Sequence, residues 1–96
     1  MSHVSAYYQV DVFADRALQG NPLAVVAQAQ GFLGWQVHQG LESPERYLLM
    51  IRWETLENHS VDFRQGPLFA QWRAIVGPYL AAPPVVEHFQ RAAGAA

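Results

Sequence analysis

Cysteine, lysine and charge are absent or scarce in this sequence. Without cysteine, the chain can form neither a disulfide nor a thiolate zinc site, and it has no thiol nucleophile. All six basic side chains are arginines, spread along the chain, and the formal net charge is -2. A protein that binds nucleic acid needs clustered positive charge to neutralise phosphates. We therefore expect no nucleic-acid partner.

Long hydrophobic runs are also missing. No stretch approaches the roughly 20 apolar residues that a membrane-spanning helix requires. The amino terminus has no basic segment followed by an apolar one, so it does not resemble a secretion signal. From these absences we expect a cytoplasmic protein without a membrane partner.

Apolar side chains are in surplus. Of the 96 residues, 51% are hydrophobic and only 15% are charged, against roughly 25% charged residues in an ordinary soluble domain. A chain of this length forms one domain, 1–96, and so small a domain cannot bury that much apolar surface inside itself. The surplus predicts a partner surface, and we expect that the partner is a second copy of the chain, giving a homodimer.

Alternating residues predict three strands in the first half of the chain. Residues 7–13 read as a strand with Val10 and Val12 inward. Residues 33–39 and 46–54 read as a hairpin, because the Gly, Ser and Pro in residues 40–45 are typical of a turn. In its second strand the apolar side chains occupy both faces. One face holds Tyr47, Leu49, Ile51 and Trp53, and the other holds Leu48 and Met50.

The second half of the chain predicts a broken helix and a last strand. Thr55 is placed to cap a helix, Gly66 interrupts it, and Pro67 suits the first turn of a new helical segment. That segment carries apolar residues at helical spacing: Leu68, Phe69, Trp72, Ile75 and Val76. Gly77 and Pro78 then end it. The pair Pro83-Pro84 predicts extended backbone that continues as a strand over 85–89, and residues 91–96 read as a frayed tail.

Residues 21–30 leave two possibilities open. Asn21 as cap, Pro22 at the first helical position and Gly31 after the end describe a short helix. The run Leu23-Ala24-Val25-Val26 would serve equally as a strand. With the helix, the order is strand, helix, strand, strand, helix, strand. That is the split βαβ order of an α+β ferredoxin-like domain, whose helices cover one face of an antiparallel sheet and leave the other face open for a dimer contact.

Residues 31–90 resemble antibiotic-biosynthesis monooxygenase domains. The resemblance follows a specific order of motifs: Gly-Phe-Leu-Gly at 31–34, Tyr-Leu-Leu leading to Trp-Glu at 53–54, Leu-Glu-x-His at 56–59, Phe-Arg at 63–64, a paired Phe and Trp, and Pro-x-Val-x-His-Phe at 84–89. It implies a ferredoxin-like protomer whose sheets form a dimeric α+β barrel. Some members oxygenate aromatic polyketides without metal or flavin, and others degrade haem.

Residues 7–26 resemble a different family. The segments YYQVDVF and GNPLAVV are similar to the amino terminus of the phenazine-biosynthesis isomerase and epimerase-like family, where they form a hairpin in a far longer protein. The catalytic Glu of that family lies beyond the matching segment, so isomerase activity is not expected. Taken together, the two resemblances describe a chimera, with residues 1–30 joined to a monooxygenase-like core.

The monooxygenase resemblance implies a set of site residues. Trp53 and His59 are the candidate catalytic residues, although an aromatic residue at position 53 is more often a core residue and His59 also fits an exposed first helical turn. An aromatic pocket with a few polar contacts is what cofactor-free oxygenation requires. The candidate substrate-binding residues are Trp35, His38, Arg52, Phe63, Phe69 and Trp72, and Arg52 with His59 is expected to hold an oxyanion.

We expect neither metal nor haem chemistry. His38, His59 and His88 form no closely spaced pair of the kind that binds a metal. Haem-degrading relatives carry an Asn on the first strand, where this chain offers Gln9 and Asp11. The resemblance therefore implies a monooxygenase without a cofactor, acting on a small aromatic or quinol substrate. The alternative is a catalytically silent dimerisation domain.

Overall fold

The computed structural model describes residues 3–12 and 21–94. Its strands and helices follow one another along the chain as β1 (Val4–Asp11), α1 (Asn21–Val26), β2 (Phe32–Gln39), β3 (Arg46–Trp53), the π-helix η2 (Asn58–Phe63), α2 (Pro67–Val76), the 3-10 helix η3 (Gly77–Tyr79) and β4 (Val85–Gln90). The strands form one sheet in the order β2-β3-β1-β4, and every neighbouring pair is antiparallel. This arrangement confirms the predicted ferredoxin-like α+β fold.

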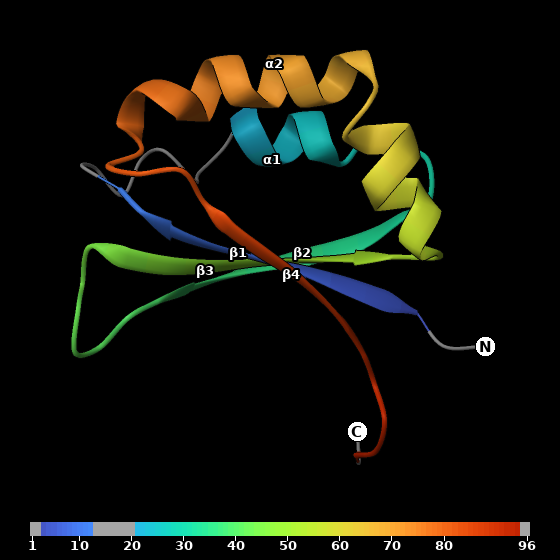
Figure 1. Ribbon diagram of the computed structural model, residues 1–96, viewed down its shortest axis with the longest axis horizontal. Helices are drawn as coiled ribbons and strands as arrows, with labels where there is room; N and C mark the ends of the chain where they lie inside the picture. Colours follow the sequence, from blue (N-terminus) through green and yellow to red (C-terminus); the bar gives the residue numbers. More distant parts are fainter. Residues whose placement is uncertain (1–2, 13–20, 95–96) are drawn as a thin grey trace.

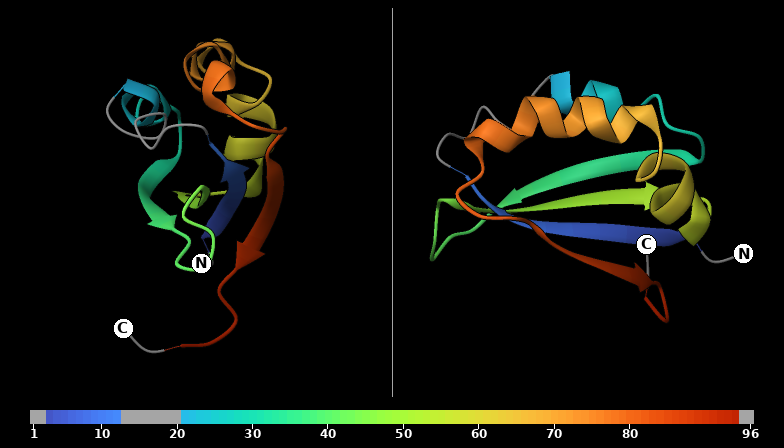
Figure 2. Two further views of the ribbon diagram at one scale, coloured as in Figure 1. Left: turned by 90° about the vertical axis from the view of Figure 1, so that its left-hand side faces the viewer. Right: turned by 45° about the horizontal axis from the view of Figure 1, so that its top comes forward.

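Both helices lie on one face of the sheet, and the other face is bare (Figure 1). Figure 2 shows α1 above β2 and α2 above β1 and β4, so the helices lie side by side along the sheet. β2 and β4 are the two edge strands. We call the side under the helices the covered face and the other side the open face. Among the described residues, no helix is long and apolar enough to cross a membrane.

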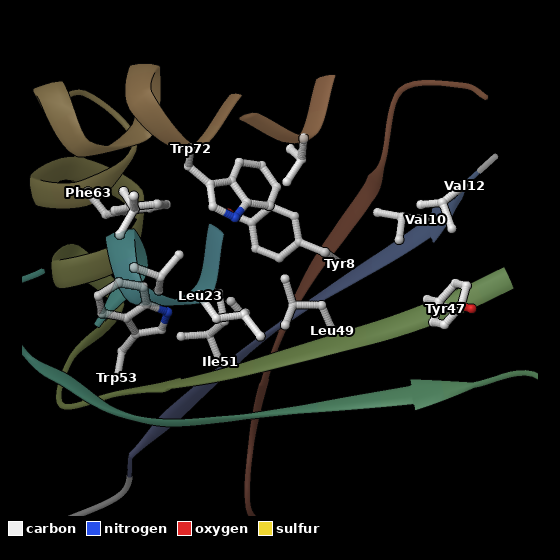
Figure 3. Close-up of a cluster of buried hydrophobic side chains, with 14 residues drawn as sticks. Tyr8, Val10, Val12, Leu23, Tyr47, Leu49, Ile51, Trp53, Phe63 and Trp72 are labelled. Atoms are coloured by element: carbon white, nitrogen blue, oxygen red, sulfur yellow. The ribbon is translucent and has the colours of Figure 1, made fainter. Parts of the chain in front are cut away.

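The hydrophobic core lies between the helices and the covered face (Figure 3). As predicted, Val10 and Val12 point inward from the first strand, and Tyr8 joins them because it lies two residues before Val10. The predicted division of β3 is also confirmed, with its four odd-numbered apolar residues buried and Leu48 exposed on the open face. Phe13, the last residue of the predicted strand 7–13, lies outside the described residues, as do residues 14–20.

Residues 21–26 form the helix and not the strand. The helix is shorter than the predicted segment, because the amides of Gln28 and Ala29 bond three residues back, to Val25 and Val26, and tighten the chain into turns. Gly31 has a backbone φ of +80°, a conformation that other residues rarely adopt. A Cβ there would collide with the Asn58 carboxamide, so Gly31 allows β2 to start against η2.

The predicted cap at Thr55 is present, but the helix that follows is unusual. The Thr55 hydroxyl accepts a hydrogen bond from the Asn58 amide at 3.2 Å, as an N-cap does. From Asn58 to Phe63 the backbone then winds as a π-helix, in which bonds span five residues, and the Arg64 amide donates to the His59 carbonyl at 3.0 Å. Such wide turns are rare and frequently occur at functional sites.

Candidate functional site

A line of three polar side chains crosses the interior from β1 through η2 to β4. The Tyr8 hydroxyl is hydrogen-bonded to His59 Nε2, and His59 Nδ1 lies 2.6 Å from His88 Nε2. Tyr8 and His59 are fully buried, whereas His88 lies on edge strand β4 and is exposed. The line therefore connects the core with solvent, and we call it the Tyr8–His59–His88 line.

Aromatic rings enclose His59. Its ring is stacked on Phe63 with centroids 6.0 Å apart, and the Trp53 ring lies 5.4 Å away. Tyr8 contacts Trp72 at 5.3 Å, and the close-up in Figure 3 shows these two rings beside each other. The imidazole consequently lies in a dry aromatic shell, where hydrogen bonds and charges act more strongly than they do in water.

This environment keeps both buried groups uncharged near neutral pH. Burial above all, together with the nearby His88 and Arg64, lowers the pKa of His59 from 6.5 to about 4. Burial raises the pKa of Tyr8, although the positive charge of Arg64 opposes this effect. A neutral imidazole has one donor and one acceptor nitrogen, so the hydrogen bonds of the line can run from Tyr8 towards His88 or in reverse. Switching between the two directions moves a proton along the line.

A pocket of about 590 Å³ opens beside this line. It lies between α2, the chain leading into β4 and the Tyr8 end of the line, with Phe69, Trp72 and Val86 on its apolar wall. Arg64 and Arg73 also line it. The buried indole N–H of Trp72 has no acceptor among the described residues, which leaves a donor unused beside the pocket.

The structure brings together five of the eight predicted site residues. Trp53, His59 and Phe63 are in mutual ring contact. Phe69 continues this group through Phe63, with centroids 5.5 Å apart, and stacks on Trp72 at 5.9 Å. The catalytic role assigned to Trp53 and His59 stays a prediction, but the expectation of an exposed first-turn histidine is wrong, since His59 has no exposed surface.

Three predicted site residues lie elsewhere. Trp35 lies on edge strand β2, opposite Ile51 of β3, and is 46% exposed. It is remote from the pocket, because the pocket lies beside the opposite edge strand, β4. His38 is on the open face, opposite Leu48, and hydrogen-bonds Gln36 at 3.1 Å. His38 therefore cannot bind one metal together with His59 and His88.

The prediction that Arg52 belongs to the site is also wrong. It lies on the open face of β3, opposite Ser5 and Gly34, so the sheet separates it from His59 and the two cannot share an oxyanion. The arginine on the side of His59 is Arg64, which sequence reasoning missed because nothing in the pattern indicated a π-helix. Tyr8 was also missed, although its alternation with Val10 already placed it inward, where a phenol needs a hydrogen-bond partner.

Fold and site together define a small α+β protein in which the Tyr8–His59–His88 line meets an aromatic pocket. The family model for antibiotic biosynthesis monooxygenase matches residues 7–75. The chain therefore belongs to the antibiotic biosynthesis monooxygenase family. It is 32% identical over 78 residues to the uncharacterised protein YczJ of Bacillus subtilis strain 168, a match that covers 81% of this chain and 80% of YczJ.

Solved structures agree with this assignment. A candidate antibiotic biosynthesis monooxygenase from Bordetella bronchiseptica is 35% identical, with a TM-score of 0.81 over 97% of this chain and 100% of that one. The monooxygenase from the gene ActVA-Orf6 of Streptomyces coelicolor, in complex with nanaomycin D, has a TM-score of 0.79. It covers 99% of this chain and 92% of its own at 17% identity, and this likeness shows the fold alone.

The comparisons give no support to a foreign amino-terminal segment. The family model begins at residue 7, and the Bordetella match spans nearly the whole chain. β1 and α1 also occupy the positions that the ferredoxin-like order assigns to them. A second origin for residues 7–26 therefore has no support in the fold or in the matching proteins.

Proposed function

We propose that this domain is a monooxygenase that needs no cofactor and acts on a small aromatic or quinol substrate. The observation that carries the proposal is the Tyr8–His59–His88 line, which meets the aromatic pocket at Tyr8 and solvent at His88. Such a substrate must lose a proton before it can pass an electron to O2. The line offers a route for that proton out of a dry site.

The chemistry balances with O2 as the oxidant. For an anthrone-type substrate, the ring CH2 and O2 give a ring C=O and water. The residues of the chain orient the substrate, exclude water and move the proton. In the enol tautomer of the substrate, the O–H donates to the Tyr8 oxygen as the Tyr8 proton passes to His59 Nε2. The reduced oxygen takes a proton back from solvent when water forms. His59 passes its Nδ1 proton to His88. Because the pKa of His59 is about 4, a proton is not retained on this imidazole and moves onward to His88.

The test is oxygen consumption with hydroquinone and anthrone-like substrates. Tyr8→Phe keeps the ring packing and removes the hydroxyl, and His59→Ala and Trp53→Ala remove the neighbouring rings. We expect Tyr8→Phe to lower kcat by about 100-fold, the usual contribution of a positioned proton-transfer group. His38→Gln, on the open face, is the matched control and should match the wild type. Wild-type turnover by Tyr8→Phe would refute the proposed route.

A second function, a catalytically silent dimerisation domain, is favoured by the open face. This face carries a hollow of about 380 Å³ lined by Tyr7, Gln9, Leu48, Val85, Glu87 and Phe89. Phe89 is 51% exposed and packs edge-on against Tyr7 with ring centroids 5.1 Å apart. We propose that two copies pair through their open faces in either case. Absence of turnover above buffer across the substrate panel would favour the silent domain.

A further inference from the structure

Two guanidinium groups flank one ring beside the pocket. Arg64 follows η2 directly and Arg73 lies in the last turn of α2. Their Cζ atoms lie 5.3 Å and 5.9 Å from the centroid of the Phe69 ring. Contact with an aromatic face attracts a cation and restricts its motion. Both residues also line the pocket of about 590 Å³, so both charges are held near the same space.

Among the residues that the structure describes, no carboxylate pairs with Arg64 or Arg73. The described residues that line the pocket include no Asp or Glu. Arg46 and Asp11 form an ion pair, but they belong to β3 and β1 and not to the pocket. Arg64 and Arg73 therefore make the pocket locally positive in a chain whose formal net charge is -2. A site of this kind attracts an anion that the protein as a whole repels.

The rest of the pocket wall is apolar and aromatic. Phe69 stacks on Trp72 with ring centroids 5.9 Å apart, and Leu80, Pro84 and Val86 complete the wall. An apolar slot of this kind suits a flat ring. The planar guanidinium groups suit the two oxygens of a carboxylate, which they can bind with paired hydrogen bonds.

We propose that the pocket binds a small aromatic compound that carries a carboxylate, with the ring against Phe69 and Trp72 and the carboxylate at Arg64 and Arg73. That this compound is the substrate rests on the proposed function. That the pocket binds such a compound depends only on the pocket and its charges. The two arginines determine specificity and take no part in proton transfer.

The test is isothermal titration calorimetry with two probes of one shape, 2-naphthoate and the uncharged 2-naphthalenemethanol. We expect 2-naphthoate to bind about tenfold more tightly at low salt, and this preference to shrink as ionic strength rises. Arg64→Gln and Arg73→Gln should each weaken 2-naphthoate binding about threefold to tenfold and leave the alcohol unaffected. Arg52→Gln changes the net charge equally on the open face and should bind 2-naphthoate like the wild type.

Equal affinity for the two probes, or no binding of 2-naphthoate at millimolar concentration, would overturn the inference. So would a loss of affinity in Arg52→Gln as large as that in Arg64→Gln, because the effect would then be one of net charge. Selective 2-naphthoate binding without turnover of any substrate would support the charged pocket while the proposed oxygenase activity fails. Turnover of neutral quinols with no preference for the carboxylate probe would support the oxygenase activity and overturn the charged pocket.

Discussion

The buried His59 predicts a loss of stability in mild acid. In the unfolded chain a histidine titrates near 6.5, whereas burial, His88 and Arg64 lower the pKa of His59 in the folded protein to about 4. Between these two values the unfolded chain binds a proton that the folded chain does not. The contribution of His59 to stability is therefore complete above about pH 6.5 and is lost as the pH falls towards 4.

The size of the effect follows from the shift in pKa. A shift from 6.5 to about 4 limits the contribution to about 3 kcal/mol. When the pH falls from about 7 to about 5, proton binding by the unfolded chain lowers the free energy of unfolding by about 2 kcal/mol. For a domain of this size that corresponds to a decrease in Tm of about 10 °C, which is large beside a typical total stability of about 5–15 kcal/mol.

The assay is urea unfolding of three proteins at both pH values and at one protein concentration, since association of the chains would add to stability. The wild type and His38→Gln, whose change lies on the open face, should lose stability alike. His59→Gln has no titratable group at this position, so its loss should be smaller by about 2 kcal/mol. An NMR titration of the wild-type His59 ring gives the folded-state pKa directly and does not depend on whether the variant folds.

Two results would refute this reasoning. The first is a His59 ring that titrates near 6.5, which would mean that the imidazole is hydrated and that the aromatic shell does not exclude water. The second is an equal loss of stability in His59→Gln and the wild type, which would assign the acid sensitivity to other groups.

Four further substitutions, in two matched pairs, test the remaining structure. Gly31→Ala should cost more than about 2 kcal/mol, because φ is +80° and the new Cβ meets the Asn58 side chain. Gly77→Ala, with no atom within 4 Å, should be neutral or stabilise by up to about 1 kcal/mol, and both are measured by urea unfolding. Phe89→Glu should shift sedimentation towards monomer because it places a charge on the open face. Leu41→Glu, at a residue 92% exposed in the hairpin turn, should sediment like the wild type.

Much of the fold could be predicted because its signals are local. The two faces of β3 follow from alternation over a few residues, and the turn before Arg46 follows from its Gly, Ser and Pro. Residues 21–26 were ambiguous because a short apolar run fits either structure. Packing decides the outcome: Leu23, Val25 and Val26 are all buried in the hydrophobic core, and a helix places them there while it bonds its own backbone groups.

The site was harder to predict because it depends on which face and which edge a residue occupies. Arg52 and Trp53 are neighbours in the sequence, yet alternation along β3 places them on opposite faces of the sheet. His38 fails as a site residue for the same reason. Trp35 is on the correct face but on the wrong edge strand, and strand order is a long-range property that local patterns do not contain.

The π-helix connects these local and long-range features. Its hydrogen bond from the Arg64 amide to the His59 carbonyl spans five residues, so one wide turn presents His59 to the core and Arg64 to the pocket. The turn is held at its start by Asn58, whose Oδ1 accepts hydrogen bonds from the Thr55 amide at 3.1 Å and the Thr55 hydroxyl at 2.9 Å. Asn58 in turn needs the space left by Gly31. A side chain at Gly31 would thus disturb the Tyr8–His59–His88 line by displacing the backbone of the π-helix, without touching Tyr8, His59 or His88.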